Sequence, residues 1–227
     1  MKKLFLASML LIAANFSAAL FAGSPNDTPF EPNLVKLVSS DGWTVVNRNI
    51  RLLSEGGIKF AHFDGDAGAG VAWLENYEFS DGTIEFDVRG ENVFQKSFVG
   101  IAFHGVGETQ YEAIYFRPFN FTAGDSLKRI HSMQYIAPPT YGWQKIRTEH
   151  PGVYEQPVQP APDPNGWFHV RLVVDGSTVS VFVNNSQKPS LEVTRLSDVK
   201  NGRIGMWVGD DSGGDFAHLR ILSLIHI

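Results

Sequence analysis

The sequence predicts an all-β protein, an antiparallel two-sheet jelly-roll sandwich. Short runs rich in Val, Ile, Phe, Tyr and Thr recur along the chain, and Gly, Asp, Asn and Pro separate them. No long stretch keeps the 3.6-residue apolar period of a helix. Many short strands joined by tight turns in one chain are typical of a sandwich.

The first 22 residues are expected to be a signal peptide. Lys2 and Lys3 precede a run from Leu4 to Leu20 that carries no charge, and small residues follow up to Ala22. A membrane anchor is the alternative, but polar residues interrupt the run and no basic cluster follows it. We therefore expect residues 23–221 to form one secreted or periplasmic domain, without a membrane partner after cleavage.

The strands of this domain are expected in chain order, each bounded by turn residues. They are Trp43–Asn47, Ile50–Leu53, Gly57–Phe63, Gly70–Leu74, Tyr77–Arg89, Phe98–His104, Tyr111–Arg117, Ile130–Tyr135, Trp167–Val174, Thr178–Val183, Leu191–Thr194, Arg203–Val208 and Phe216–Ile221. The clearest hairpin turns at Asp175-Gly176, because the apolar positions alternate on both sides of that turn.

Residues 118–166 depart from this pattern. They carry eight prolines and many aromatic residues. Loops of this length are functional or disordered as a rule, and disorder does not fit so many aromatic residues. We expect an ordered excursion packed on the same domain.

The last six residues, 222–227, resemble the translation of a transposase-adapter sequence used in library preparation. We predict that they are a sequencing artefact and that the natural chain continues differently after Ile221. The alternative is that they extend the last strand.

Composition excludes several classes of protein. The chain has no cysteine, which excludes a disulfide scaffold and a lipid anchor on cysteine. Its formal net charge is −5 and its basic residues form no stripe, which argues against a nucleic-acid partner.

The hairpin from Phe98 to Arg117 is expected to hold a binding trough. Period-two alternation sends Val99, Ile101 and Phe103 into the core. The other face then carries small residues in the middle, with larger side chains around them: Phe98, His104, Tyr111, Tyr115 and Arg117. Aromatic platforms beside fixed hydrogen-bond donors suit a sugar ring. The alternative is that the small residues only make room for the long loop.

Glu112, His104 and Arg117 are the candidate catalytic residues. Glu112 falls on the core-facing side of its strand, where a carboxylate is either paired at the rim or a general acid or base. Glu85 and Asp87 share a strand face, as in glucanases that use two carboxylates. Gly90 stands where a third acidic residue is needed, so a solvated outer face is the simpler interpretation.

Further binding candidates lie in the excursion. His131 and Tyr135 are expected on one strand face, forming a pocket wall with His104, and Trp143 is an aromatic candidate. No spacing of histidines and carboxylates specifies a metal. Two acidic glycine loops, Asp64–Asp66 and Asp210–Asp215, contain oxygens that suit calcium, and simple turns are the alternative.

Several segments together resemble the concanavalin A-like lectin and glucanase superfamily. They are Phe79–Val88, Phe98–His104, Tyr111–Arg117, Gly202–Gly209 and Asp215–Leu219. Within it the chain looks similar to secreted laminin-G-like and 3-keto-disaccharide hydrolase-like bacterial domains. In those hydrolases a Gly-Tyr-Glu strand follows a Ser-Gly-Ile strand, and only Tyr111-Glu112 after Val99–Ile101 is similar here.

Three functional hypotheses follow. The first is a secreted module that binds a glycan on the concave face of the sandwich, with Tyr111, Tyr115, His131, Tyr135 and Trp143 as ligand-binding residues. The second is a hydrolase acting on glycosides, either 3-keto-disaccharide hydrolase-like or similar to glycoside hydrolase family 16, that uses Glu112 with His104 and Arg117. The third is a structural envelope protein without a ligand. The hydrolase requires the three catalytic candidates to converge in one pocket.

Overall fold

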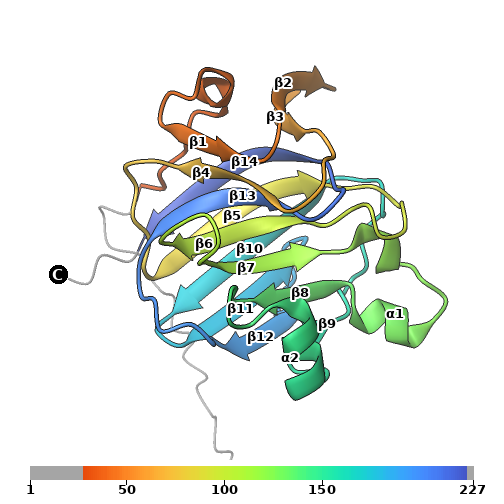
Figure 1. Cartoon of the computed structure of the whole chain (residues 1–227). Coiled ribbons are helices and arrows are strands. Elements are labelled where there is room, and N and C mark those ends of the chain that lie inside the picture. Colours follow the sequence, from red (N-terminus) through yellow and green to blue (C-terminus); the bar gives the residue numbers. More distant parts are fainter. Residues whose placement is uncertain (1–27, 224–227) are drawn as a thin grey trace, which may run out of the picture.

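A computed structural model describes residues 28–223 as a sandwich of two seven-stranded antiparallel sheets, which confirms the predicted fold class (Figure 1). Sheet 1 has the order β1 (Trp43–Val46), β4 (Gly70–Leu74), β13 (Arg203–Val208), β6 (Val99–Gly105), β7 (Glu112–Phe116), β8 (Met133–Ile136) and β9 (Glu155–Gln156). Sheet 2 has the order β12 (Leu191–Thr194), β11 (Thr178–Val183), β10 (Phe168–Asp175), β5 (Gly82–Arg89), β14 (Gly214–Ser223), β3 (Ile58–Phe63) and β2 (Ile50–Glu55). A short 3-10 helix, η1 (Leu34–Ser39), precedes β1.

The core lies between the sheets and follows the strand alternation. Ile84, Phe86 and Val88 of β5 are buried, and the residues between them are only half-buried. The hairpin of β10 and β11 turns at Asp175-Gly176 as expected, with Val174 opposite Val179. Alternating apolar residues therefore determine which face of each strand is buried.

The excursion from residue 118 to residue 166 is ordered and packs on sheet 1, as predicted. It contains η2 (Pro118–Asn120), α1 (Ser126–Ile130), β8, α2 (Trp143–Glu149) and β9. The expected strand Ile130–Tyr135 is wrong at its start, because the Asp125 side chain accepts from the Leu127 amide and caps a helix there. Helices of five and seven residues are too short to show a periodic pattern.

Both chain ends carry predictions that the structure leaves open. The predicted signal peptide, residues 1–22, lies outside the described residues. Leu222 and Ser223 of β14 pair with Thr83 and Gly82 of β5, and the rest of the segment 222–227 is not described. The origin of this segment stays a prediction. Within residues 28–223 no helix is long and apolar enough to cross a membrane.

Candidate functional site

A pocket lies on the outer face of sheet 1, away from the core. One row of directly paired residues crosses this face, with Trp207 on β13, Gly100 on β6, Tyr115 on β7 and Gln134 on β8. A side chain at position 100 would meet the Ile114 carbonyl oxygen at 2.1 Å, so this close approach of β7 requires glycine. The rings of Tyr115 and Trp207 therefore meet across Gly100, with centroids 5.1 Å apart and ring planes tilted by 42°.

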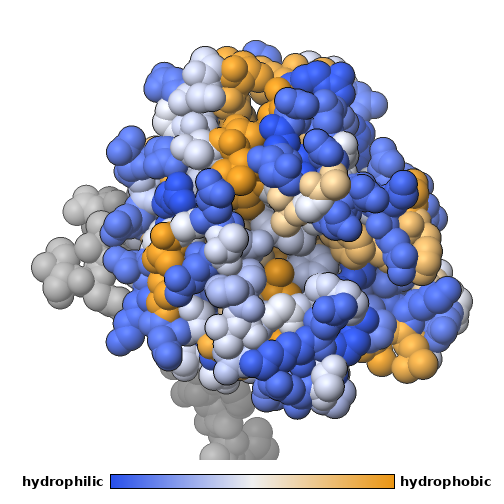
Figure 2. All heavy atoms as spheres, viewed as in Figure 1, coloured by the Kyte–Doolittle hydropathy of each residue, from blue (hydrophilic) through white to orange (hydrophobic). Residues whose placement is uncertain are grey.

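The pocket has a volume of about 620 Å³, within the range of small-molecule sites. Figure 2 shows the hollow near the middle of this face, with pale and some hydrophobic residues inside and mostly hydrophilic ones around it. Sheet 1 supplies the floor, and α1, α2 and the loops around Phe94 and Asp210 supply the walls. The lining residues are Ala69, Phe94, Gln95, Phe98, Tyr115, Arg117, Phe119, Asn120, Lys128, His131, Ile136, Trp143, Arg147, Trp207, Gly209 and Asp210.

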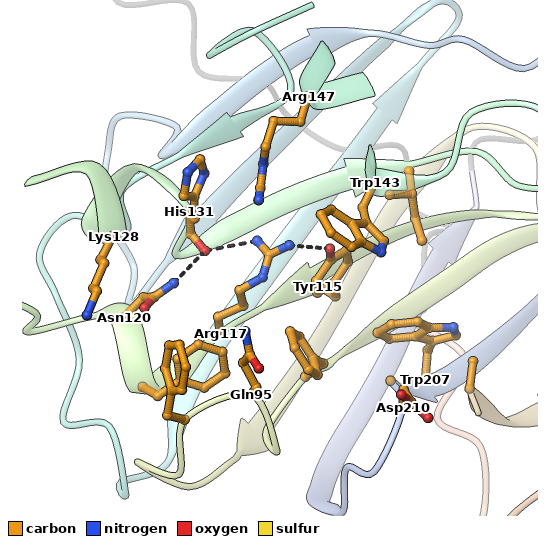
Figure 3. Close-up of a pocket in the computed structure, with 16 residues that line it drawn as sticks. Gln95, Tyr115, Arg117, Asn120, Lys128, His131, Trp143, Arg147, Trp207 and Asp210 are labelled. Carbon is orange, nitrogen blue, oxygen red and sulfur yellow. Dashed lines mark hydrogen bonds between the residues drawn. The ribbon is translucent and has the colours of Figure 1, made fainter. Parts of the chain in front are cut away.

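Arg117 is held in place by a network of hydrogen bonds on the pocket floor (Figure 3). Its Nη2 atom donates to the Tyr115 hydroxyl at 2.5 Å and to Gln134 Oε1 at 2.6 Å. Its Nη1 atom donates to the His131 carbonyl oxygen at 2.9 Å. Burial raises the pKa of Tyr115 to about 12, so this hydroxyl stays protonated and donates to Gln134.

A buried carboxylate, Glu155 of β9, supports the wall above Arg117. Its two oxygens accept from Arg147 Nε at 2.8 Å and Nη2 at 2.7 Å, and His131 Nδ1 lies 2.7 Å from Oε2. Burial alone would raise the pKa of Glu155, but the hydrogen bonds and charges of Arg147 and His131 outweigh it and lower the pKa. The carboxylate is therefore ionised and orients both side chains.

Four of the predicted site residues line the pocket together: Tyr115, Arg117, His131 and Trp143. Tyr111 lies on the same face but outside the pocket lining, where its hydroxyl accepts from Trp207 Nε1 at 3.0 Å. Tyr135 faces the core, since it pairs with the core residue Ile114. The expected wall of His131 with Tyr135 is therefore wrong, because the strand turns Gln134, not Tyr135, toward the pocket.

Strict alternation predicts that His104 lies on the pocket face. In the structure it lies inside the sandwich instead. Ala102 pairs with Gly205 of β13, and Gly105 pairs with Arg203. Two residues of β6 therefore lie opposite one residue of β13, so β6 carries one additional residue at this point. His104 has a φ of +51°, and this β-bulge turns its side chain into the interior. Its exposed fraction is 0%.

Glu112 is also completely buried and is the centre of an ionic cluster between the sheets. His104 Nδ1 lies 2.8 Å from Glu112 Oε1, and Arg195 Nε donates to both carboxylate oxygens at 3.0 and 3.1 Å. The Tyr135 hydroxyl donates to Oε2. Arg117 belongs to the other face of sheet 1, so the structure does not bring Glu112, His104 and Arg117 together in one pocket, as the hydrolase hypothesis requires.

The carboxylates of β5 lie on the outer face of sheet 2. Asp87 contacts His169 Nδ1 at 2.8 Å and His218 Nδ1 at 2.6 Å, and Glu85 lies 3.5 Å from Arg220. They form a paired surface row, as the simpler interpretation expects. Within residues 28–223 no group of three or more His, Asp or Glu side chains is arranged to hold a metal ion.

The two acidic glycine loops lie side by side, and an arginine occupies the space between them. The Gly68 amide donates to Asp210 Oδ1 at 2.6 Å, and the Asp211 amide donates to the Asp66 carbonyl at 2.9 Å. Arg48 is buried there and donates to four backbone carbonyl groups, those of Asn47, Gly68, Gly209 and Ser212. These loops do not fit calcium, because their described carboxylates are not grouped to hold a metal ion and the Arg48 guanidinium group occupies four of the nearby carbonyl oxygens.

We expect Arg48→Lys to lower the free energy of unfolding by about 1.5 kcal/mol, because an ammonium group cannot reach all four carbonyl groups. Chelation with EDTA is expected to leave the thermal midpoint of the wild type unchanged. Both are checked by thermal and urea unfolding. Arg51→Lys is the matched control, since Arg51 pairs with Asp64 on the surface. A wild-type midpoint that falls in EDTA would contradict this role of Arg48.

Not every pocket residue was predicted from the sequence, although strand alternation could have identified Trp207. Ile204, Met206 and Val208 alternate as core positions, and this places Trp207 on the open face. Arg147, Glu155 and Lys128 had no such signal, because short helices and a two-residue strand bring them to the pocket. Arg195 lies in a loop and meets Glu112 only in the folded chain.

No family model matches the sequence, and no curated protein matches it either. Solved structures do match the fold. Carbohydrate-binding module CBM66 from Bacillus subtilis has a TM-score of 0.56 at 14% identity, covering 78% of this chain and 93% of that one. The carbohydrate recognition domain of Emp46p in its metal-free form has a TM-score of 0.54 at 15% identity, with 86% and 95% covered.

The exoplasmic/lumenal domain of VIP36, bound to Ca²⁺ and Man3GlcNAc, is also similar. Its TM-score is 0.51 at 12% identity, covering 83% of this chain and 86% of that one. At these identities the likeness concerns the fold alone, an antiparallel two-sheet sandwich.

Proposed function

We propose that this protein is a secreted carbohydrate-binding domain that recognises a glycan in the pocket on the concave outer face of sheet 1. The observation that carries the proposal is the combination of Trp143, Trp207 and Tyr115 with the polar network around Arg117 in one pocket. Sugar C–H faces stack on aromatic rings, and sugar hydroxyls need directional donors and acceptors. Trp143, which is 45% exposed, provides the open aromatic ring, and the polar side chains around it provide hydrogen-bonding groups, within about 620 Å³.

The similar solved structures support this proposal. CBM66 and the Emp46p domain are named for carbohydrate binding or recognition, and the VIP36 domain holds a mannose-containing glycan. The predicted signal peptide supports secretion, which would bring the domain to extracellular polysaccharides.

A glycoside-processing hydrolase, 3-keto-disaccharide hydrolase-like or family 16-like, is less well supported. It would use Glu112 with His104 and Arg117, but Glu112 and His104 are enclosed between the sheets. Among the described residues that line the pocket, the only carboxylate is Asp210. A retaining glycosidase needs two carboxyl groups about 5 Å apart. The geometry therefore favours binding without hydrolysis.

The test is a glycan array and native affinity gels with purified mature chain, run beside an assay for released reducing sugar. We expect binding to at least one polysaccharide and no release. A chain that is folded and binds no glycan on the array or in the gels would refute the proposal. Release of reducing sugar would support the hydrolase instead.

A further inference from the structure

One end of the pocket carries an excess of positive charge. Arg117, Arg147 and Lys128 lie there, together with His131 (Figure 3). Among the described lining residues the one acidic side chain, Asp210, lies beside Trp207 at the opposite end (Figure 3). The positive charge is therefore concentrated at one end of the pocket, where Lys128 lies 5.6 Å from the Phe94 ring centre and Arg147 lies 5.1 Å from the Trp143 ring centre.

The buried carboxylate behind this wall does not neutralise it. Glu155 binds Arg147 with both oxygens, and Arg117 Nη1 lies 3.9 Å from it, so one carboxylate serves two guanidinium groups. In the described part of the chain Lys128 has no carboxylate partner within ion-pair distance, and its ammonium group lies 5.6 Å from the Phe94 ring centre. Three permanent cations against one anion leave two positive charges facing the pocket.

An unpaired acceptor lies at the same end. Asn120 is buried, and its Nδ2 atom donates to the His131 carbonyl oxygen at 3.2 Å. Its Oδ1 atom has no hydrogen-bond partner among the described residues. Buried polar atoms are almost always paired, so a hydroxyl group of a ligand is a fitting partner. The charge excess therefore fits an anionic group, and the unpaired acceptor fits a hydroxyl group beside it.

We propose that the pocket selects a sugar residue that carries an anionic group, a carboxylate or a sulfate ester, with this group at Lys128, His131 and Arg147. The sugar ring then stacks on Trp143, whose ring lies next to Arg147. This inference rests on the proposed function, since it names the class of glycan for the same site. The physical reason is that hydrogen bonds between ionised partners are about twice as strong as neutral ones, and more so in a partly dry pocket.

The experiment compares matched pairs of ligands by isothermal titration calorimetry at low and physiological salt. Oligogalacturonate is compared with its methyl-esterified form, and sulfated galactan with neutral galactan, so that the two arms separate carboxylate from sulfate. We expect at least one anionic member to bind at least about tenfold more tightly, with a preference that weakens as salt increases. Lys128→Gln is expected to lose most of the preference, and Lys128→Arg to keep it.

Lys188→Gln is the matched control, because Lys188 is an exposed loop residue that does not line the pocket. Neutral members that bind as tightly as the anionic ones would overturn the inference and leave the proposed function standing. An anionic preference that survives in both Lys128→Gln and Trp143→Ala would also overturn it, as non-specific attraction of a polyanion. Absence of binding to these ligands would overturn the inference alone, whereas absence of binding to every glycan on the array would overturn the proposed function.

Discussion

Replacing Glu112 by glutamine is expected to lower the free energy of unfolding by about 3–5 kcal/mol, the usual cost of removing one partner from a buried ion pair. The side chain of Glu112 is fully buried, and that of Arg195 is only 8% exposed. Glutamine keeps the shape of the side chain but leaves the Arg195 charge inside the protein without a carboxylate. Urea unfolding measures the effect as a lower midpoint at an unchanged slope.

Glu192→Gln is the matched control for this prediction, because Glu192 is an exposed glutamate of β12 and Ser180 is its one hydrogen-bond donor among the described residues. We expect it to change the stability by less than about 0.5 kcal/mol. Combining Glu112→Gln with Arg195→Met should cost less than the two single changes added together, since the unpaired charge disappears. Simple additivity would show that the two side chains are not coupled.

The effect of Glu112→Gln is also expected to depend on pH. Burial alone would raise the pKa of Glu112, but hydrogen bonds from His104, Arg195 and Tyr135 outweigh it and hold the pKa below its ordinary value of 4.5. A carboxyl group with a lowered pKa stabilises the folded state above the unfolded pKa and loses this contribution as pH falls through the folded pKa. The difference between wild type and variant should therefore shrink in acid, as measured by urea unfolding at neutral and acidic pH. A difference that grows in acid would contradict the lowered pKa.

Replacing Trp143 by alanine is expected to weaken glycan binding about 30-fold, about 2 kcal/mol of lost contact between ring and sugar. Trp143 begins α2, lines the pocket and is 45% exposed, so its removal opens no cavity in the core. The fold should therefore keep its thermal midpoint. Affinity gels and calorimetry measure the loss with the glycan found in the screen.

Two variants make the Trp143 result specific. Trp143→Phe keeps an aromatic platform and should keep most of the affinity. Phe30→Ala removes an aromatic side chain that is equally exposed, at 43%, but lies outside the pocket lining, and it should leave binding unchanged. Full affinity of Trp143→Ala would mean that the sugar does not stack on this ring. Trp207 is less suitable, because it is buried and bonded to Tyr111.

Much of the sandwich could be predicted from alternation alone. The strands around Trp43, Gly70, Phe98, Thr178 and Arg203 lie where they were expected, within one or two residues at each end. Period-two patterns state which face is apolar, and burial of that face is the largest favourable contribution to folding. The excursion was harder, because its short helices depend on a cap at Asp125 and on contacts with sheet 1.

The site was predictable only where it follows a regular strand. Tyr115 and Arg117 follow the alternation of β7, so both were placed on the correct face. His104 was not, because one additional residue in β6 reverses the direction of every side chain after it, and the bulge depends on pairing with β13. Tyr135 was predicted on the pocket face, but Gln134 lies there. The reason is related, since the register of β8 with β7 decides which of its residues face the core.

By itself, then, the sequence determined an all-β chain, the core faces of its regular strands and an open face with aromatic and basic residues on one hairpin. Only the tertiary structure decided that Arg48 holds the acidic loops together, that Glu112 meets Arg195 83 positions away, and that Lys128, Arg147 and Trp143 surround one pocket. The reason is physical. Alternation is a local property of each strand, whereas partners across sheets and loops are chosen by register, bulges and the burial of charge.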